Sequence, residues 1–232
     1  MISIVIPTYN EENYLPTLLC SIQEQDFKDY EIIVADNNSK DRTRELARAA
    51  GARVVSGGKL PAIGRNNGAR RANGDILLFL DADGYMPRGF LLKALCDFKK
   101  RKLGVAGCYM APMSDKLVDK AYFNFFNKYI FSTQKIFPTL GGGCMLARKD
   151  VHEKAEGFDE QVLVLEEYDY VKKCLKYGDF GVIRHKFYTS VRRFENFGRL
   201  TVGGTLVLLN IYRALFGPIK KEIFKYEFDY KK

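Results

Sequence analysis

The sequence lacks the spacings from which metal centres and disulfide scaffolds are usually built. No two of its five cysteines form a CxxC pair, their number is odd, and two histidines occur among 232 residues. No zinc-ligand spacing is present, and the cysteines fit a reduced intracellular protein better than a disulfide scaffold. There is also no P-loop and no recognisable Ser-His-Asp set, which argues against P-loop nucleotidases and serine hydrolases.

Long apolar runs are missing as well. Residues 201–217 are apolar, but they include the glycine pair 203–204, Asn210 and Arg213, and fall short of the ~20 apolar residues that a membrane span needs. The chain begins at once with the strand-like run ISIVIP, without a signal peptide's basic region or apolar core. We therefore expect a cytoplasmic protein in which residues 201–217 form an interfacial or packing helix.

Basic residues outnumber acidic ones by 37 to 28, which gives a net charge of +9. This excess favours nucleotides, anionic lipid surfaces or nucleic acid as partners, although scattered lysines and arginines also typify a generally basic surface. Neither an RRM-like aromatic motif nor a concentrated basic helix is present, so we expect no nucleic-acid partner. The lysine-rich end, residues 220–232, would suit peripheral contact with the anionic cytoplasmic face of a membrane.

The first half of the chain alternates strand and helix patterns. Short apolar, β-branched runs predict strands at 2–6, 31–35, 52–55, 76–80 and 104–110. Apolar spacing, caps and terminal glycines predict helices at 11–25, from Ser39 or Asp41 to about Ala50, and at 61–73. Strands separated by helices imply right-handed crossovers. They predict an α/β fold with a mostly parallel sheet and helices on both faces.

The second half is less regular. Residues 115–137 predict an aromatic-rich helix, and residues 166–177 predict another helix. Residues 141–149 indicate a glycine-rich turn that leads into a strand. One face of the aromatic helix is typical of core packing, and a lipid-facing or acceptor-covering helix is the alternative. That face carries Val118, Tyr122, Phe125, Phe126 and Tyr129.

Two aspartates directly follow the buried strand 76–80. Asp81 and Asp83 would repel each other there and lose hydration, which raises the question of what they hold. In open parallel sheets, ligands bind beyond the carboxyl ends of strands, and side chains two residues apart on an extended segment point the same way. Their oxygens suit Mg²⁺ or Mn²⁺, with positions left for substrate phosphates. The alternative is a capping Asp81 and a solvated Asp83.

Polar residues also follow the first two strands, at the same edge of the predicted sheet. Pro7 fixes the chain and Tyr9 offers a stacking face after the first strand. Asp36, after the second strand, can accept a hydrogen bond from a base N–H or a ribose hydroxyl. Arg65 lies between the third and fourth strands and can reach a phosphate. These residue types suit a nucleotide.

The motifs, taken in order, resemble the family 2 glycosyltransferases of GT-A fold. They read SIVIPTYNEE, VADNNSKDRT, GRNNGARRANGDILLFLDADG, GFDE and EEYDYVKKCLKYG, and they cover residues 2 to about 178. The resemblance implies a Rossmann-like, mostly parallel sheet with a nucleotide-sugar-binding half at 1–110 and an acceptor-binding half at 111–194. Residues 195–232 would form a C-terminal helical and basic extension.

The resemblance also implies roles for individual residues. The donor would be a UDP- or GDP-linked sugar, and Mg²⁺ or Mn²⁺ would be the metal. Asp81 and Asp83 match the family's D-x-D pair, with Asp83 favoured as the direct metal ligand. Arg192 or Arg193, in an Arg-Arg element, could neutralise the diphosphate, or both could be solvated surface charges. Residues implied to line the nucleotide pocket or to reach its phosphates are Pro7, Tyr9, Glu11, Asp36 and Arg65.

Two departures from the family pattern matter. The family commonly has Asp-Asp-Gly-Ser after its second strand, and here Asn37 follows Asp36, so one aspartate is retained. The Glu-Asp pair of the late helix is here Glu166-Glu167. Glu167 stands where the catalytic aspartate is expected and can still act as a base, and Glu166 is the fallback. A charged first helical turn is the structural alternative for both glutamates.

These residues predict a metal-dependent, inverting glycosyltransferase of hexosyltransferase type. It would move a sugar from a nucleoside-diphosphate sugar to a hydroxyl of a glycan or lipid-linked acceptor, with Glu167 as the base. A polyprenyl-phosphate glycosyltransferase, whose lipid phosphate acceptor needs no base, is one alternative. A non-catalytic nucleotide- or membrane-binding protein is another, and the loss of the D-x-D pair or of the late carboxylates would favour it. A nucleotidyltransferase would need a glycine-rich basic loop after the first strand, and none is present.

Overall fold

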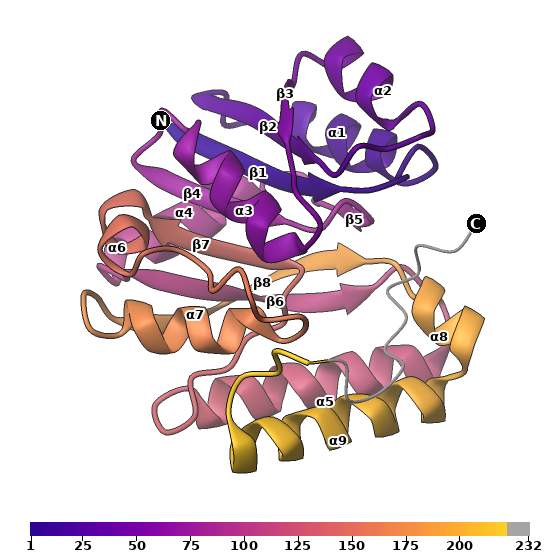
Figure 1. Ribbon diagram of the computed structural model, residues 1–232, viewed down its shortest axis with the longest axis vertical. Coiled ribbons are helices and arrows are strands. Elements are labelled where there is room, and N and C mark those ends of the chain that lie inside the picture. The colour runs from indigo at the N-terminus through magenta and orange to yellow at the C-terminus, as the bar shows by residue number, and fades with distance from the viewer. Residues whose placement is uncertain (222–232) are drawn as a thin grey trace.

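The computed structural model describes residues 1–221, which form one eight-stranded sheet. Helices surround this sheet (Figure 1). The strand order is β3-β2-β1-β4-β7-β6-β8-β5. The predicted fold class, a mostly parallel sheet covered by helices, is confirmed. The strands are β1 (Ile2–Thr8), β2 (Tyr30–Asp36), β3 (Arg53–Ser56), β4 (Ile76–Leu80), β5 (Gly84–Tyr85), β6 (Val105–Pro112), β7 (Cys144–Arg148) and β8 (Phe180–Thr189).

Alternation along β1 builds two cores, one on each face of the sheet. Ile4 and Ile6 pack on one face with α1 (Leu15–Gln23), α2 (Thr43–Ala49) and α4 (Phe90–Lys100). Val5 faces the other core, with α3 (Pro61–Arg70), α6 (Lys149–Lys154) and α7 (Glu166–Cys174). Since successive strand side chains point to opposite faces, an all-apolar strand such as β4 needs helices on both sides.

The first four strands of the order, β3-β2-β1-β4, are all parallel, so their carboxyl ends share one edge. The antiparallel strand β7 joins β4 to β6, and β6 pairs in parallel with β8. Strand β7 therefore brings the glycine-rich turn before Cys144 to the edge at which β4 ends. Helix α3 lies directly on β1, because a β-carbon at Gly68 would overlap the side chain of Val5.

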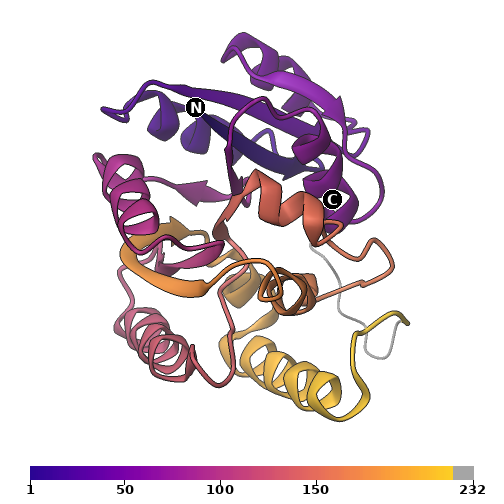
Figure 2. The same cartoon turned by 90° about the vertical axis from the view of Figure 1, so that its left-hand side faces the viewer.

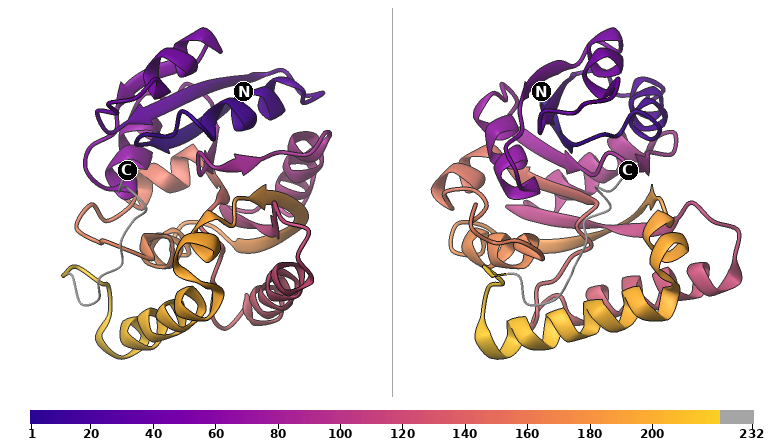
Figure 3. Two further views of the ribbon diagram at one scale, coloured as in Figure 1. Left: turned by 90° about the vertical axis from the view of Figure 1, so that its right-hand side faces the viewer. Right: turned by 45° about the vertical axis from the view of Figure 1, so that its right-hand side comes forward.

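Two long helices form a layer beneath the sheet, α5 (Leu117–Thr133) and α9 (Arg199–Phe216). Figures 2 and 3 show them side by side below β6 and β8, with α8 (Arg192–Phe197) leading into α9. Asn127 fixes α5 to β6, since its amide bonds both the N–H and the carbonyl of Met110, at 2.9 and 2.7 Å. A charged pair between Asp119 and Arg199 joins the two helices.

The predicted core packing of the aromatic face of α5 is wrong. Val118, Phe125 and Tyr129 are exposed, whereas α5 buries Asp119, Asn127 and Ile130. The helix predicted at 201–217 is α9, and Leu209 is its one buried residue. Within residues 1–221, none of the helices combines the length and apolar composition needed to cross a bilayer. Most of the lysine-rich end lies outside the described residues.

Candidate active site

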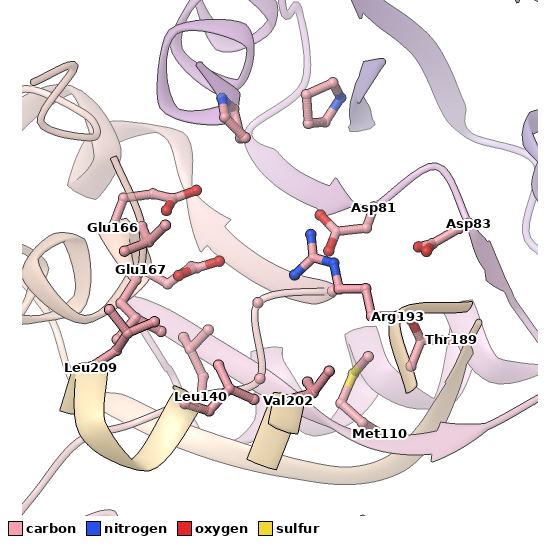
Figure 4. Close-up of a pocket in the computed structure, with 18 of the residues that line it drawn as sticks. Asp81, Asp83, Met110, Leu140, Glu166, Glu167, Thr189, Arg193, Val202 and Leu209 are labelled. Atoms are coloured by element: carbon pink, nitrogen blue, oxygen red, sulfur yellow. The ribbon is translucent and has the colours of Figure 1, made fainter. Parts of the chain in front are cut away.

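A cavity of about 800 Å³ opens at the carboxyl ends of the parallel strands (Figure 4). Its upper part is polar and lies against the ends of β1, β2 and β4, and its lower part reaches α5 and α9. Of the predicted site residues, those that line it are Pro7, Tyr9, Glu11, Arg65, Asp81, Asp83, Glu166, Glu167 and Arg192. Arg65 and Glu167 thus line the same cavity although they are 102 positions apart in the sequence.

Asp81 and Asp83 sit in the turn between β4 and β5, not on an extended strand. Each is paired with a different arginine: Arg65 lies 3.0 Å from Asp81, and the Nε of Arg192 lies 3.1 Å from Asp83. Burial raises the pKa of Asp83, and the charge of Asp81 raises it further, while Arg192 lowers it. The two carboxylates therefore interact electrostatically across one cavity.

The two carboxylates fit a hard divalent cation, because both offer oxygen ligands to the same cavity. Within the described residues, no cluster of three or more histidine, cysteine or acidic side chains gathers that could hold a metal. Asp81 and Asp83 would therefore supply two ligands, and the remaining positions would fall to substrate phosphates and water.

Arg65 occupies the centre of a buried charge cluster at the start of α7. Its guanidinium pairs with Glu166, lies 3.0 Å from Asp81 and lies 3.7 Å from Glu167. Burial lowers the pKa of Arg65, but the surrounding carboxylates more than offset this effect and raise it above its usual value. The arginine that was predicted to reach a phosphate thus holds three carboxylates in place.

Glu166 and Glu167 have different surroundings although they are adjacent. Glu166 is tied to Arg65, whereas burial, followed by the charge of Glu166, raises the pKa of Glu167 to about 8. The glycine-rich turn before β7 allows this arrangement, because a β-carbon at Gly142 would overlap the carboxylate of Glu167. A carboxyl group with a pKa near neutrality is suited to proton transfer.

Arg192 bridges the first strand's loop to the D-x-D turn. It donates two hydrogen bonds to Glu11, at 2.9 and 2.8 Å, and lies over the ring of Tyr14 at 4.6 Å. Burial raises the pKa of Glu11 and the Arg192 contact lowers it, with a net increase. Figure 4 shows the side chain of Arg193 reaching toward the space below Asp81. The Arg-Arg element therefore lies at the cavity and not on open surface.

Asp36 is not among the residues that line the cavity. Its buried carboxylate accepts hydrogen bonds from the Thr8 hydroxyl at 3.0 Å and from the N–H and hydroxyl of Ser39. Its neighbours Ala35 and Asn37 line the cavity instead. Asp36 thus shapes the loop after β2, and a direct contact with a nucleotide stays a prediction.

The loop after β3 was not among the site residues predicted from the sequence. Gly57, Gly58 and Lys59 line the cavity next to the strand ends. A signal was present, because the pair of glycines and the lysine follow directly on a strand that was predicted to end at the same sheet edge. Backbone without side chains and one cation are features that suit a phosphate-bearing ligand.

Solved structures with a similar fold include glycosyltransferases. Staphylococcus aureus TarS (residues 1–349), solved in complex with UDP, matches with a TM-score of 0.67 and 24% identity over 82% of this chain and 60% of that one. The mannosyltransferase PcManGT of Pyrobaculum calidifontis, in complex with GDP-Man and Mn²⁺, has a TM-score of 0.67 and 21% identity over 82% of this chain and 56% of its own. At these identities the likeness shows the GT-A fold.

Sequence comparison then shows the family. The model of glycosyl transferase family 2 matches residues 3–155, and the chain belongs to this family. An uncharacterized glycosyltransferase of Haemophilus influenzae is 30% identical over 78% of this chain. The chain covers 64% of that relative, which is less than two thirds of its length.

Proposed function

We propose that this protein is a metal-dependent, inverting glycosyltransferase that moves a sugar from a nucleoside-diphosphate sugar to an acceptor hydroxyl. One observation carries the proposal: Asp81, Asp83 and Glu167 line the same cavity. The D-x-D pair suits a metal–diphosphate complex, and a carboxylate with a pKa near 8 suits a general base. Membership of family 2 supports the same activity.

The donor would lie against the strand ends in the half formed by residues 1–110. Pro7, Tyr9 and the loop after β3 line this part of the cavity. TarS was solved with UDP and PcManGT with GDP-Man and Mn²⁺, which supports a UDP- or GDP-linked sugar and Mn²⁺ or Mg²⁺ here. Asp81 and Asp83 would hold the metal, which supplies charge neutralisation for the departing nucleoside diphosphate.

The acceptor would enter through the half formed by residues 111–194 and place a hydroxyl at Glu167. Glu167 takes the proton of this hydroxyl. At the same time the hydroxyl oxygen of the acceptor bonds to the anomeric carbon of the donor sugar, and the bond between that carbon and the diphosphate breaks. One base and one leaving group make a single displacement, which inverts the anomeric configuration. Arg192 and Arg193 line the same cavity and would balance the charge of the diphosphate.

Peripheral contact with the cytoplasmic face of an anionic membrane belongs to the same proposal. Helix α9 presents Leu200, Leu208 and Leu215 to the outside, and all three are exposed. An exposed apolar helix face together with a net charge of +9 suits an anionic interface. Flotation with anionic vesicles at low salt tests the contact, and protein that stays at the bottom of the gradient would refute it.

The activity itself is tested by incubating the protein with UDP- and GDP-sugars and Mn²⁺ or Mg²⁺, and measuring nucleoside diphosphate release. Release that depends on metal and ceases in chelator is expected. Transfer to glycosides tests for a hydroxyl acceptor, and transfer to a polyprenyl phosphate tests the alternative. Turnover that survives chelator, or no binding of any sugar nucleotide, would contradict the proposal.

A further inference from the structure

The lower part of the cavity has a different chemistry from the sheet edge. One wall is aromatic and belongs to α5, and the opposite wall is aliphatic and belongs to α9. We call this space the apolar groove. Its walls are Tyr122, Phe125, Phe126 and Tyr129 on α5, and Val202, Leu206, Val207 and Ile211 on α9.

Much of the groove wall remains open to solvent within residues 1–221. Phe125 is 73% exposed, Val207 58% and Ile211 52%. Apolar side chains that gather on two facing helices and stay in water are unfavourable for a fold of this size. A contiguous exposed patch of this kind marks a binding surface.

Polar contacts fix the positions of the two walls. Asp119 of α5 accepts two hydrogen bonds from Arg199 of α9, at 2.6 and 2.8 Å. Asn127 ties α5 to the backbone of β6, at 2.9 and 2.7 Å. Within residues 1–221, the helices are therefore positioned by contacts outside the groove and not by closing on each other, and the apolar walls stay available to a ligand.

The groove begins at the proposed base. Glu167 and its neighbour Tyr168 line the same cavity as the groove walls. Figure 4 shows Glu167 above Leu140 and Leu209, with Val202 beside them. A hydroxyl at Glu167 therefore has apolar surface directly beyond it, on the side away from Asp81 and Asp83.

We propose that the apolar groove binds the hydrocarbon chain of an amphipathic acceptor, whose hydroxyl-bearing head group lies at Glu167. The inference rests on the proposed glycosyl transfer and narrows its acceptor to a lipid-linked one. A single hydrocarbon chain fits because the apolar groove runs between two helices and continues from the active site. A bilayer surface would instead contact outward residues such as Leu200, and a second copy of the chain would cover both helices.

The first test measures the binding of alkyl maltosides to the full chain by calorimetry. Octyl, decyl and dodecyl maltoside are used below their aggregation concentrations, with maltose as the control. Each methylene that enters an apolar groove should strengthen binding roughly fourfold, until the groove is filled. An affinity that does not depend on chain length would overturn the inference.

The second test compares substitutions inside and outside the groove. Phe125→Ser and Leu206→Ser should weaken dodecyl maltoside binding at least about tenfold. Leu117→Ser and Leu200→Ser remove exposed side chains of the same two helices that lie outside the groove, and should change it by no more than about twofold. Circular dichroism checks that the variants fold. Equal losses from both pairs would point to the outer surface and overturn the inference.

Two further measurements separate this inference from its rivals and from the proposed function. A dimer in sedimentation that Phe125→Ser dissociates would assign the groove to a second copy and overturn the inference. Donor binding with Mn²⁺ is measured on the unaltered protein. If the protein binds the donor but not the alkyl chains of the maltosides, the groove assignment alone is overturned. If it does not bind the donor, glycosyl transfer is contradicted and, with it, the acceptor role of the groove.

Discussion

The two ends of the cavity are lined by side chains of opposite character. At the sheet edge, Arg65 and Arg192 are each paired with more than one carboxylate from distant parts of the chain. At the lower end of the cavity, α5 and α9 face it with apolar side chains that stay exposed, such as Phe125 and Ile211. One end is a fixed electrostatic frame and the other is an apolar surface.

This difference suits a cavity shared by the two unlike substrates that we propose. Charged groups held by buried pairs keep their positions when a ligand arrives, which suits a donor with a metal and a diphosphate. Burial of an apolar surface lowers the free energy roughly in proportion to the area buried. This gain is non-directional, so ligands of different shapes can bind. Glu167 lies where the two ends meet. The following experiments disturb one end at a time.

The largest effect is expected at the meeting point. Glu167→Gln keeps the shape of the side chain but cannot accept a proton. Transfer should fall about 10²–10⁴-fold, while the affinity for the sugar nucleotide stays near that of the unaltered protein. Initial rates and calorimetric donor binding measure the two quantities.

Glu166→Gln is the matched control, because Glu166 points to Arg65 and one residue is about 100° around the helix. Its loss of rate should be smaller. An inactive Glu166→Gln beside a nearly normal Glu167→Gln would show that the base is one position earlier. Normal rates in both variants would favour a lipid phosphate acceptor.

Gly142→Ala should move the base without changing it. The added methyl group would overlap the carboxylate of Glu167, so the side chain must shift. A displacement of about 1 Å at a catalytic group can cost on the order of 10²-fold in rate. Gly204→Ala is the control, since a β-carbon there meets no atom within 4 Å and should leave the rate unchanged. Equal rates in both variants would refute the close approach of Gly142 to the base.

The pH dependence should report the same base. Because the pKa of Glu167 is raised to about 8, the group is mostly protonated at lower pH and unable to accept a proton. The value of kcat/KM should therefore decrease about tenfold for each pH unit below about 8. A pH profile of the unaltered protein checks this limb, and Glu167→Gln should lack it. A plateau that extends down to the ordinary range of glutamate would contradict the assignment.

The smallest effect is expected in the layer of α5 and α9 beneath the sheet, where a substitution should change the stability of the fold and not the rate of transfer. Asn127→Ala removes the amide that pairs with both backbone groups of Met110 and leaves them buried without that partner. The free energy of unfolding should decrease by about 1–3 kcal/mol. Asn124→Ala, at an exposed position of the same helix, should change it little. Urea unfolding compares them, and equal stabilities would mean that α5 is held by other contacts.

The parallel strands could be predicted because each is a short apolar run bounded by polar residues, as in β4. Strand β8 was missed, since Arg184, His185 and Lys186 interrupt its apolar pattern. The structure explains this: pairing with β6 jumps from Ile183 to Lys186 across a bulge. Helix α4 was missed although its apolar residues have helical spacing, as at Leu91, Ala94, Leu95 and Phe98.

For the site, the sequence predicted which groups gather but not their pairing. Asp81, Asp83 and Glu167 come to one cavity as predicted, because strand ends and the start of α7 share one edge. The partners of Arg65 and Arg192 could not be predicted, since Glu166 and Glu11 lie 101 and 181 residues away in the chain. Such pairs follow from the packing of complete elements and not from any local pattern.

The most direct test of the central claim, a metal-assisted donor site at the sheet edge, is the calorimetric titration of a sugar nucleotide with and without Mn²⁺. Asp83→Asn is compared with Asp115→Asn, which alters a fully exposed aspartate. We expect metal-dependent binding that Asp83→Asn abolishes and Asp115→Asn retains. Equal, metal-independent binding by both variants would contradict the assignment of Asp83 and the function built on it.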